Sequence, residues 1–270
     1  MTTAARRFVE WNRQISRWQR SLLARVMPGC AYDGPRAFRD QVLPSLITSG
    51  QRVLDVGGGK HPAISVELKR QLGLHVVGLD IAEDELVQAP PGAYDAIVVG
   101  DAATVEIPGR YDLIFSRSVF EHVADPRAAM ANLAGVLAPG GVMGHIMPCR
   151  NAPFAVLNRS LGNGLARRLL FAIYPEKRED SGFHAYYREC TPSRLSRICR
   201  ETGLEIVQVV PYYNSAYASF FAPLYTIDML RQALMCGLGL RNFAESFSLV
   251  ARRPSAEVRR DGHSRSTAYS

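Results

Sequence analysis

A short apolar stretch that runs into a set of glycines constrains this chain more than any other feature. Val53-Leu54-Asp55-Val56-Gly57-Gly58-Gly59 is typical of a buried strand that ends in a glycine turn. Gly57 and Gly59 tolerate positive φ, and without a Cβ they let a ligand approach the backbone closely. Pro62 follows where a helix would begin, because its fixed φ suits a first helical turn. The stretch therefore predicts a ligand-binding crevice at the carboxyl end of a parallel strand.

Strand and helix patterns alternate after this stretch. Such alternation predicts an α/β fold with a parallel sheet and helices on both faces. We predict strands over 51–56, 74–80, 95–100, 111–116, 141–147, 204–211 and 246–251. We predict helices over 62–72, 83–88, 126–137 and 192–201. These segments form one domain over residues 51–253, with insertions at 151–190 and 212–242.

Residues 1–50 form a predicted amphipathic helical extension, with a long helix over 6–27 and a short one near 36–47. The apolar residues of the long helix recur every three or four positions, which places them on one stripe. They are Phe8, Trp11, Ile15, Trp18, Leu22 and Val26. The stripe suits a helix docked on the domain, or a basic helix lying on an anionic membrane surface. Insertion 212–242 is similarly apolar, which suits a lid, a homodimer interface or a second membrane contact.

The net charge of +7 is concentrated at the two ends of the chain. Residues 1–40 hold eight basic and three acidic side chains, and residues 251–270 hold five and two. The central part holds 19 basic and 20 acidic side chains, so a basic groove for nucleic acid is not expected. From Pro254 the chain is rich in Arg and Ser, which predicts a disordered basic tail over 254–270.

The five cysteines are scattered and show no CxxC spacing, which favours reduced thiols in a cytoplasmic protein. The N-terminus lacks the apolar core of a secretory signal. No apolar run reaches the roughly 18 residues of a membrane-spanning helix. We expect a cytoplasmic protein, with peripheral binding at the inner membrane face as an open alternative.

Two further acids follow the next predicted strands, Asp80 at the second and Asp101 at the third. Ends of adjacent parallel strands lie about 5 Å apart, so these carboxylates and Asp55 should line one crevice. Asp55 suits a water-bridged ammonium group, Asp80 the hydroxyls of a ribose, and Asp101 an adenine amino group. A nicotinamide dinucleotide fits less well, because Pro62 stands where its fingerprint needs a small residue.

The motifs taken in order resemble class I S-adenosylmethionine-dependent methyltransferases of the small-molecule type. The matching segments are 53–59, 77–80, 100–102, 111–116, 118–123 and 137–141, and His61 stands where many members have a glycine. The resemblance implies a Rossmann-like, mostly parallel seven-stranded sheet closed by an antiparallel hairpin of 204–211 and 246–251. It also implies S-adenosyl-L-methionine as cofactor, S-adenosyl-L-homocysteine as product, and no metal. The implied cofactor contacts are Asp55, Gly57, Gly58, Gly59, Asp80, Ile81, Asp101, Ala102 and Ser116.

Methyl transfer to a hydroxyl requires a proton acceptor, for which His122, His145 and His184 are candidates. His145 lies inside an apolar strand and is expected to be a core residue. Glu121-His122 either takes part in the reaction or orients the loop after the fourth strand. Segment 184–189 lies before the helix that leads to the sixth strand, where such enzymes often bind acceptors. Our predicted catalytic residues are His122, His184 and Tyr187, and the predicted substrate contacts are Tyr186, Arg188 and Tyr213.

We therefore expect a methyltransferase that O-methylates a small-molecule, glycan or lipid-linked acceptor. The apolar segment before the last strand is similar to that of methyltransferases of bacterial cell-surface glycan pathways. Within the same chemistry, C-methylation of a quinone-like lipid remains open. A catalytically silent binding protein that keeps the fold is the remaining alternative.

Overall fold

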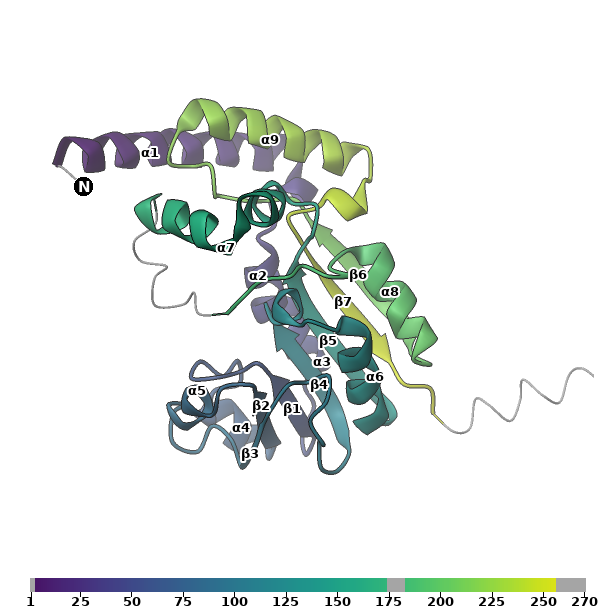
Figure 1. Cartoon of the computed structure of the whole chain (residues 1–270). Coiled ribbons are helices and arrows are strands. Elements are labelled where there is room, and N and C mark those ends of the chain that lie inside the picture. The colour runs from purple at the N-terminus through teal and green to yellow at the C-terminus, as the bar shows by residue number, and fades with distance from the viewer. Residues whose placement is uncertain (1–2, 174–182, 256–270) are drawn as a thin grey trace, which may run out of the picture.

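The computed structural model describes residues 3–173 and 183–255, and a seven-stranded sheet with helices on both faces forms its body (Figure 1). The strand order is β3-β2-β1-β4-β5-β7-β6, and all neighbours are parallel except those of β7. The strands are β1 Arg52–Val56, β2 His75–Asp80, β3 Ala96–Val99, β4 Tyr111–Arg117, β5 Leu137–Pro148, β6 Glu205–Tyr212 and β7 Ser246–Arg252. The predicted α/β fold with its closing antiparallel hairpin is confirmed.

The helices predicted between the strands are present, and two further long helices, α7 and α9, lie in the segments predicted as insertions. The α-helices are α1 Thr3–Val26, α2 Gly34–Ala37, α3 Leu43–Leu46, α4 Val66–Leu72, α5 Glu83–Val87, α6 Pro126–Val136, α7 Pro153–Ile173, α8 Pro192–Glu201 and α9 Ala222–Gly237. Shorter helical turns are η1 Pro28–Cys30, η2 Phe38–Val42, η3 Phe120–His122 and η5 Arg241–Phe243. Most of the predicted tail lies outside the described residues, as do residues 174–182 of the first insertion.

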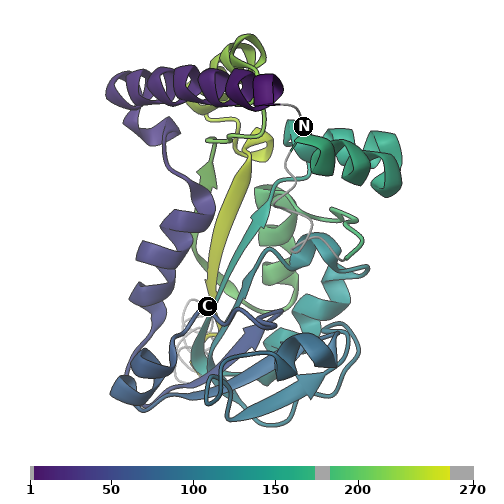
Figure 2. The ribbon, with the colours of Figure 1, turned by 90° about the vertical axis from the view of Figure 1, so that its left-hand side faces the viewer.

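Both faces of the sheet bury apolar side chains. On one face, Ile114 and Phe247 pack with Met130 and Leu133 of α6 in the larger core cluster. On the other face, Phe38 and residues of α2 and α3 pack against the sheet in a second cluster. Figure 2 shows the 34–46 segment running along this face. The second half of the predicted extension therefore contributes to the core of the domain.

One predicted helix start is wrong. The helix after the glycine turn begins at Val66 and not at Pro62. Ser65 provides the N-cap, since its Oγ accepts a hydrogen bond of 3.1 Å from the Leu68 N–H. A serine oxygen satisfies a free N–H of the first turn, which the proline does not, so residues 57–65 remain a loop that wraps the crevice.

The expectation that all thiols are reduced is also wrong, because Cys30 and Cys236 form a disulfide. Their Cα atoms lie 6.1 Å apart although 206 residues separate them along the chain. The fold brings η1 beside the end of α9, and spacing along the sequence carries no sign of that contact. Cys149, Cys190 and Cys199 are free and buried, as expected of apolar core residues.

Candidate active site

The glycine turn after β1 forms one wall of the crevice. Gly57 and Gly59 have φ values of +68° and +49°, in the region that favours glycine. A Cβ at Gly57 would clash with the side chain of Val119, and one at Gly58 would clash with the Tyr94 hydroxyl. The backbone of the turn therefore packs directly against the side chains of Val119 and Tyr94, and this packing requires glycine at both positions.

Asp55 lies directly beneath this turn and is almost fully buried, with 1% of its surface exposed. Burial raises the pKa of its carboxyl to about 7, and the nearby Arg117 guanidinium opposes that rise. Arg117 also donates a hydrogen bond of 2.6 Å to the His61 carbonyl oxygen, which holds the loop in place. A bound ammonium group would favour the charged form of Asp55.

Asp80 ends β2 beside the glycine turn. Its Oδ1 accepts a hydrogen bond of 3.1 Å from the Ala82 N–H, and a Cβ at Gly59 would lie 3.4 Å from its Oδ2. Burial raises the pKa of this carboxyl as well. Ile81 next to it is 59% exposed, an open apolar surface at the mouth of the crevice. The predicted contacts of Asp80 with the ribose hydroxyls and of Ile81 with the cofactor remain predictions.

The loop after β3 is held by hydrogen bonds to its own backbone. Asp101 Oδ1 accepts from the Ala103 N–H at 2.9 Å. Asn132 of α6 donates to the carbonyl oxygens of Ala102 and Val105, at 3.0 and 2.8 Å. The loop is thereby fixed near the ends of β1 and β2, where the adenine is predicted to bind. The adenine contacts of Asp101 and Ala102 remain predictions.

Ser116 and His145 form a buried pair in the middle of the sheet. The Ser116 Oγ lies 2.8 Å from the His145 Nδ1, and both side chains are fully buried. Burial lowers the pKa of His145 to about 3, so the imidazole is neutral at physiological pH. The hydroxyl of Ser116 is engaged by this core histidine, beneath the crevice floor. Prediction of a pocket-lining role for Ser116 rests on the resemblance alone.

Sequence reasoning missed Tyr94 and Arg117. The Tyr94 hydroxyl donates a hydrogen bond of 3.2 Å to the Gly59 carbonyl oxygen and lies over the turn. Arg117 follows the fourth-strand motif directly, and that position is the signal from which it could have been found. Tyr94 lies in a polar loop before β3, and no local pattern marks it.

His122 lies on the other side of the crevice, in the turn after β4. Its Nδ1 is 3.0 Å from the His184 carbonyl oxygen. Because a carbonyl oxygen only accepts hydrogen bonds, Nδ1 carries the proton and Nε2 keeps its lone pair. Burial lowers the pKa of His122, which keeps the ring neutral near pH 7. The geometry therefore provides a neutral imidazole with one proton-accepting nitrogen.

Aromatic side chains surround this histidine, and we call His122, Phe183, His184 and Tyr186 the aromatic cluster. The rings of His122 and Phe183 lie 6.3 Å apart, and those of His184 and Tyr186 4.3 Å apart. The Arg188 guanidinium lies 5.4 Å from the centre of the Tyr186 ring. Of the predicted residues, His184 contacts His122 directly, Tyr186 packs on His184, and Arg188 lies over Tyr186.

Backbone hydrogen bonds hold the two segments of the cluster together. The N–H groups of Tyr186 and Tyr187 donate to the Glu121 carbonyl oxygen at 2.7 and 3.0 Å. Arg188 Nη1 donates to the Ala124 carbonyl oxygen at 2.8 Å. The aromatic cluster is therefore built on a fixed backbone frame.

Tyr187 and Tyr213, also predicted site residues, point into the protein. Tyr187 is 3% exposed, and its hydroxyl accepts a hydrogen bond of 3.5 Å from Asn158. Burial raises the pKa of Tyr187 to about 12, so its phenol stays protonated. Tyr213 is 5% exposed at the end of β6, away from the aromatic cluster. The structure brings neither hydroxyl to His122.

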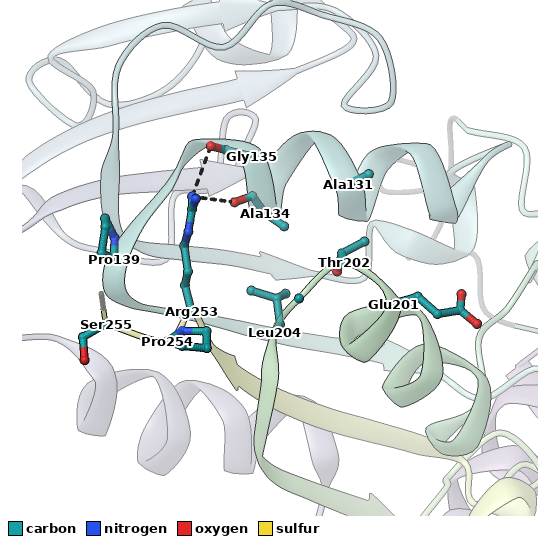
Figure 3. A pocket seen from close by; sticks show the side chains of 11 residues that line it. Ala131, Ala134, Gly135, Pro139, Glu201, Thr202, Leu204, Arg253, Pro254 and Ser255 are labelled. Carbon is teal, nitrogen blue, oxygen red and sulfur yellow. Dashed lines mark hydrogen bonds between the residues drawn. The ribbon is translucent and has the colours of Figure 1, made fainter. Parts of the chain in front are cut away.

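The pocket of about 510 Å³ in Figure 3 lies at the opposite edge of the sheet. It opens between α6, α8 and the residues after β7, and none of the predicted site residues lines it. Arg253 occupies one wall, where it donates to the carbonyl oxygens of Ala134 and Leu137 at 3.2 and 2.6 Å. These hydrogen bonds give the Arg253 guanidinium a structural role. The pocket is separate from the crevice at the carboxyl ends of β1 and β2.

Residues 30–209, about two thirds of the chain, match the methyltransferase domain family. The chain belongs to this family. A ubiquinone biosynthesis O-methyltransferase from Burkholderia pseudomallei (strain 1710b) is 32% identical over 168 residues, which cover 59% of this chain and 67% of the relative.

Solved methyltransferases share the fold. Phosphoethanolamine N-methyltransferase 2 of Haemonchus contortus, in complex with S-adenosyl-L-methionine, aligns with a TM-score of 0.53 and 16% identity over 80% of this chain and 52% of its own. An enzyme described as a methyltransferase from Bacillus halodurans aligns with a TM-score of 0.51 and 18% identity, over 80% and 99%. These likenesses concern the fold alone.

The cofactor of this methyltransferase is S-adenosyl-L-methionine, and the crevice suits it. The positive φ values of Gly57 and Gly59 shape the turn after β1, and buried or half-buried carboxylates lie beside it in β1 and at the end of β2. A carboxylate set matches a ligand with a positive ammonium and sulfonium and a free ribose, whereas it would repel a pyrophosphate. Individual contacts from Asp55, Asp80 and Asp101 remain predictions.

Proposed function

We propose that this methyltransferase O-methylates a phenolic, quinone-like acceptor. The observation that carries the proposal is the neutral His122, whose Nε2 keeps a lone pair inside the aromatic cluster. The relatives named ubiquinone biosynthesis O-methyltransferase support the same acceptor class. The proposed reaction is the O-methylation predicted from the sequence, and the proposed acceptor is the quinone-like ring of the C-methylation alternative.

The chain's own contribution to the reaction is positioning and proton transfer. The bound cofactor supplies an activated methyl group on a sulfonium. His122 Nε2 would accept the proton of the acceptor hydroxyl as the new oxygen–carbon bond forms and the sulfur–carbon bond breaks. The hydrogen bond from Nδ1 to the His184 carbonyl oxygen stabilises the ring orientation and the imidazolium that results.

The rest of the cluster would hold a flat ring against His122. Phe183 is 50% exposed and His184 and Tyr186 lie beside it, so an aromatic acceptor would find ring surfaces to pack on. Glu121, which precedes His122, is buried, and burial raises the pKa of its carboxyl to about 8. Its side chain is therefore mostly uncharged at neutral pH.

Transfer of a labelled methyl group to three acceptors tests the proposal: a prenylated catechol, the same catechol without its prenyl chain, and a lipid-linked glycan. We expect the catechols to be methylated and the glycan to be untouched. Replacing His122 by Ala should lower kcat by about 10²–10⁴ without changing cofactor affinity. His75→Ala is the matched control, because His75 lies exposed at the start of β2. Methylation of the glycan alone, or full activity of His122→Ala, would overturn the proposal.

A further inference from the structure

We infer that α1 and α9 together form a docking surface for an anionic lipid bilayer. The two helices run side by side at one end of the molecule, as both views show (Figures 1 and 2). The inference concerns where the protein binds and does not depend on the identity of the acceptor.

The contacts between the helices fix their direction. Near the start of the pair, Asn12 Oδ1 accepts a hydrogen bond of 2.9 Å from the Ala222 N–H. Further along, Gln19 donates to the Thr226 hydroxyl at 2.8 Å. Just beyond α1, the Cys30–Cys236 disulfide links η1 to the end of α9. The helices are therefore parallel and joined along their length, and we call them the helix pair.

Helix α1 turns its polar residues inward. Asn12 and Ser16 are each 2% exposed, and the Ser16 hydroxyl donates to the Ser219 carbonyl oxygen at 3.2 Å. Arg20 donates to the Tyr225 hydroxyl at 3.2 Å. A helix docked on a water-soluble domain ordinarily buries its apolar stripe instead. This helix satisfies its docking contacts with polar groups and leaves the apolar stripe for another surface.

Large apolar side chains cover the outside of both helices. Those of α1 are 48–73% exposed and are Phe8, Trp11, Trp18, Leu22 and Val26. Those of α9 are 44–67% exposed and are Leu224, Ile227, Leu230, Leu234 and Leu238. Their spacing gives one stripe per helix. Because the faces that join the parallel helices are known, the helical repeat places both stripes on the same side of the helix pair.

The charge of α1 indicates which partner binds to this surface. Residues 3–26 contain six arginines and one acid, Glu10, and the arginines include exposed Arg7 and Arg25. A symmetric dimer through this surface would bring two such helices together, and their like charges would repel. An anionic bilayer instead offers acyl chains to the stripes and phosphates to the arginines. Charge complementarity therefore favours lipid over a second copy.

The helix pair also lies at the end of the sheet where the reaction takes place. The insertion leaves β6 at Tyr212 and enters β7 at Ser246, and Ser246 pairs with both Tyr212 and Pro148. Pro148 ends β5, whose carboxyl end shares an edge with the ends of β1 and β4. Docking through the helix pair would thus bring the crevice end of the molecule toward the bilayer.

The chain carries its own reporter for the test, since Trp11 and Trp18 are its only tryptophans. Full-length protein is mixed with vesicles of phosphatidylcholine, with or without phosphatidylglycerol. We expect co-flotation with the anionic vesicles, a blue shift of tryptophan emission, and weaker binding as salt increases. Unchanged emission and no co-flotation with anionic vesicles would overturn the inference.

Two sets of variants locate the contact. The double change Leu230→Asp with Leu234→Asp should weaken vesicle binding more than tenfold, because charges would enter the acyl region. Val207→Asp is the matched control: Val207 is 58% exposed on the edge strand β6, and its change should have no effect. Each of Arg7→Gln and Arg25→Gln should weaken binding about fivefold. These milder changes leave the apolar stripes intact. They test the same membrane contact even if the double aspartate variant does not fold.

Light scattering of the protein without vesicles measures its oligomeric state, which tests whether the helix pair binds a second copy of the chain instead. A monomer that binds anionic vesicles supports the inference. A dimer that Leu230→Asp with Leu234→Asp dissociates, together with no vesicle binding, would instead assign the surface to a second copy and overturn it.

Discussion

The predicted cofactor side and the proposed acceptor side of the crevice are built in different ways; we call them the cofactor side and the acceptor side. The cofactor side consists of a glycine turn and carboxylates at the ends of β1 and β2, neighbouring strands close in sequence. The acceptor side joins the turn at Glu121 and His122 to residues 183–188, about 60 positions later. Their side chains differ as well, carboxylates on one side and aromatic rings on the other.

This difference separates the two binding functions. The positions of the turn and the carboxylates are fixed by the strands of the sheet. The aromatic cluster rests on loops, where side chains can change while the sheet remains. We therefore expect changes on one side to affect cofactor binding and changes on the other to affect acceptor turnover.

On the cofactor side, the largest effect is expected for Asp80→Ala. Loss of a carboxylate that accepts two ribose hydroxyls should weaken cofactor binding by roughly 100-fold or more, because each charge-assisted hydrogen bond contributes about 1.5–3 kcal/mol. Calorimetric titration with S-adenosyl-L-methionine measures this, and circular dichroism confirms the fold. Asp84→Ala, on the exposed side of α5, is the control. Unchanged affinity of Asp80→Ala would remove Asp80 from the cofactor site.

A smaller effect is expected from pH. The pKa of Asp55 is about 7 in the free protein, and a cationic ligand prefers the ionised form. Cofactor affinity should rise about tenfold between about pH 6 and about pH 8 as Asp55 loses its proton. Asp55→Asn should bind weakly with no such rise. An affinity that is flat with pH in the wild type would contradict the contact.

On the acceptor side, Tyr186→Leu tests the aromatic cluster. The change removes a ring that lies 4.3 Å from that of His184, and it should raise the acceptor KM about fivefold, in line with about 1 kcal/mol of ring packing. Cofactor affinity should stay the same. Tyr32→Leu, at an exposed tyrosine before α2, is the matched control. A loss of cofactor affinity in Tyr186→Leu would break the proposed separation.

The last prediction concerns stability and not activity. The folded-state pKa of Glu121 is about 8, above its ordinary value of 4.5. Between these values the folded chain keeps a proton that the unfolded chain loses, so stability falls as pH rises through the window. Glu121→Gln should remove this part of the loss, with a gain on the order of 1–3 kcal/mol above about pH 8 and little gain near pH 5. Thermal unfolding across this range measures it; an equal gain at every pH would contradict the assignment.

Local features of the sequence were sufficient for the sheet, the glycine turn and the three carboxylates. Each depends on residues within one strand and the turn that follows it. The aromatic cluster was predicted in part, since His122, His184 and Tyr186 were named without any sign that they meet.

Contacts between distant segments could not be predicted in the same way. Tyr94 reaches Gly59 across 35 residues, and Cys30 meets Cys236 across 206. The apolar stripe of α1 is evident in the sequence, but its exposure depends on contacts of Asn12 with α9 and of Ser16 with the turn before α9, which only the fold reveals. Each of these features depends on a contact between residues that are far apart in the sequence.

The position of the transferred methyl group tests the central claim most directly. The protein is incubated with methyl-labelled S-adenosyl-L-methionine and a prenylated catechol, and the product is examined by nuclear magnetic resonance. The account predicts a methyl ether, formed by the wild type and by His75→Ala and nearly lost in His122→Ala. A methyl group on a ring carbon, or no transfer by a wild type that binds the cofactor, would contradict it.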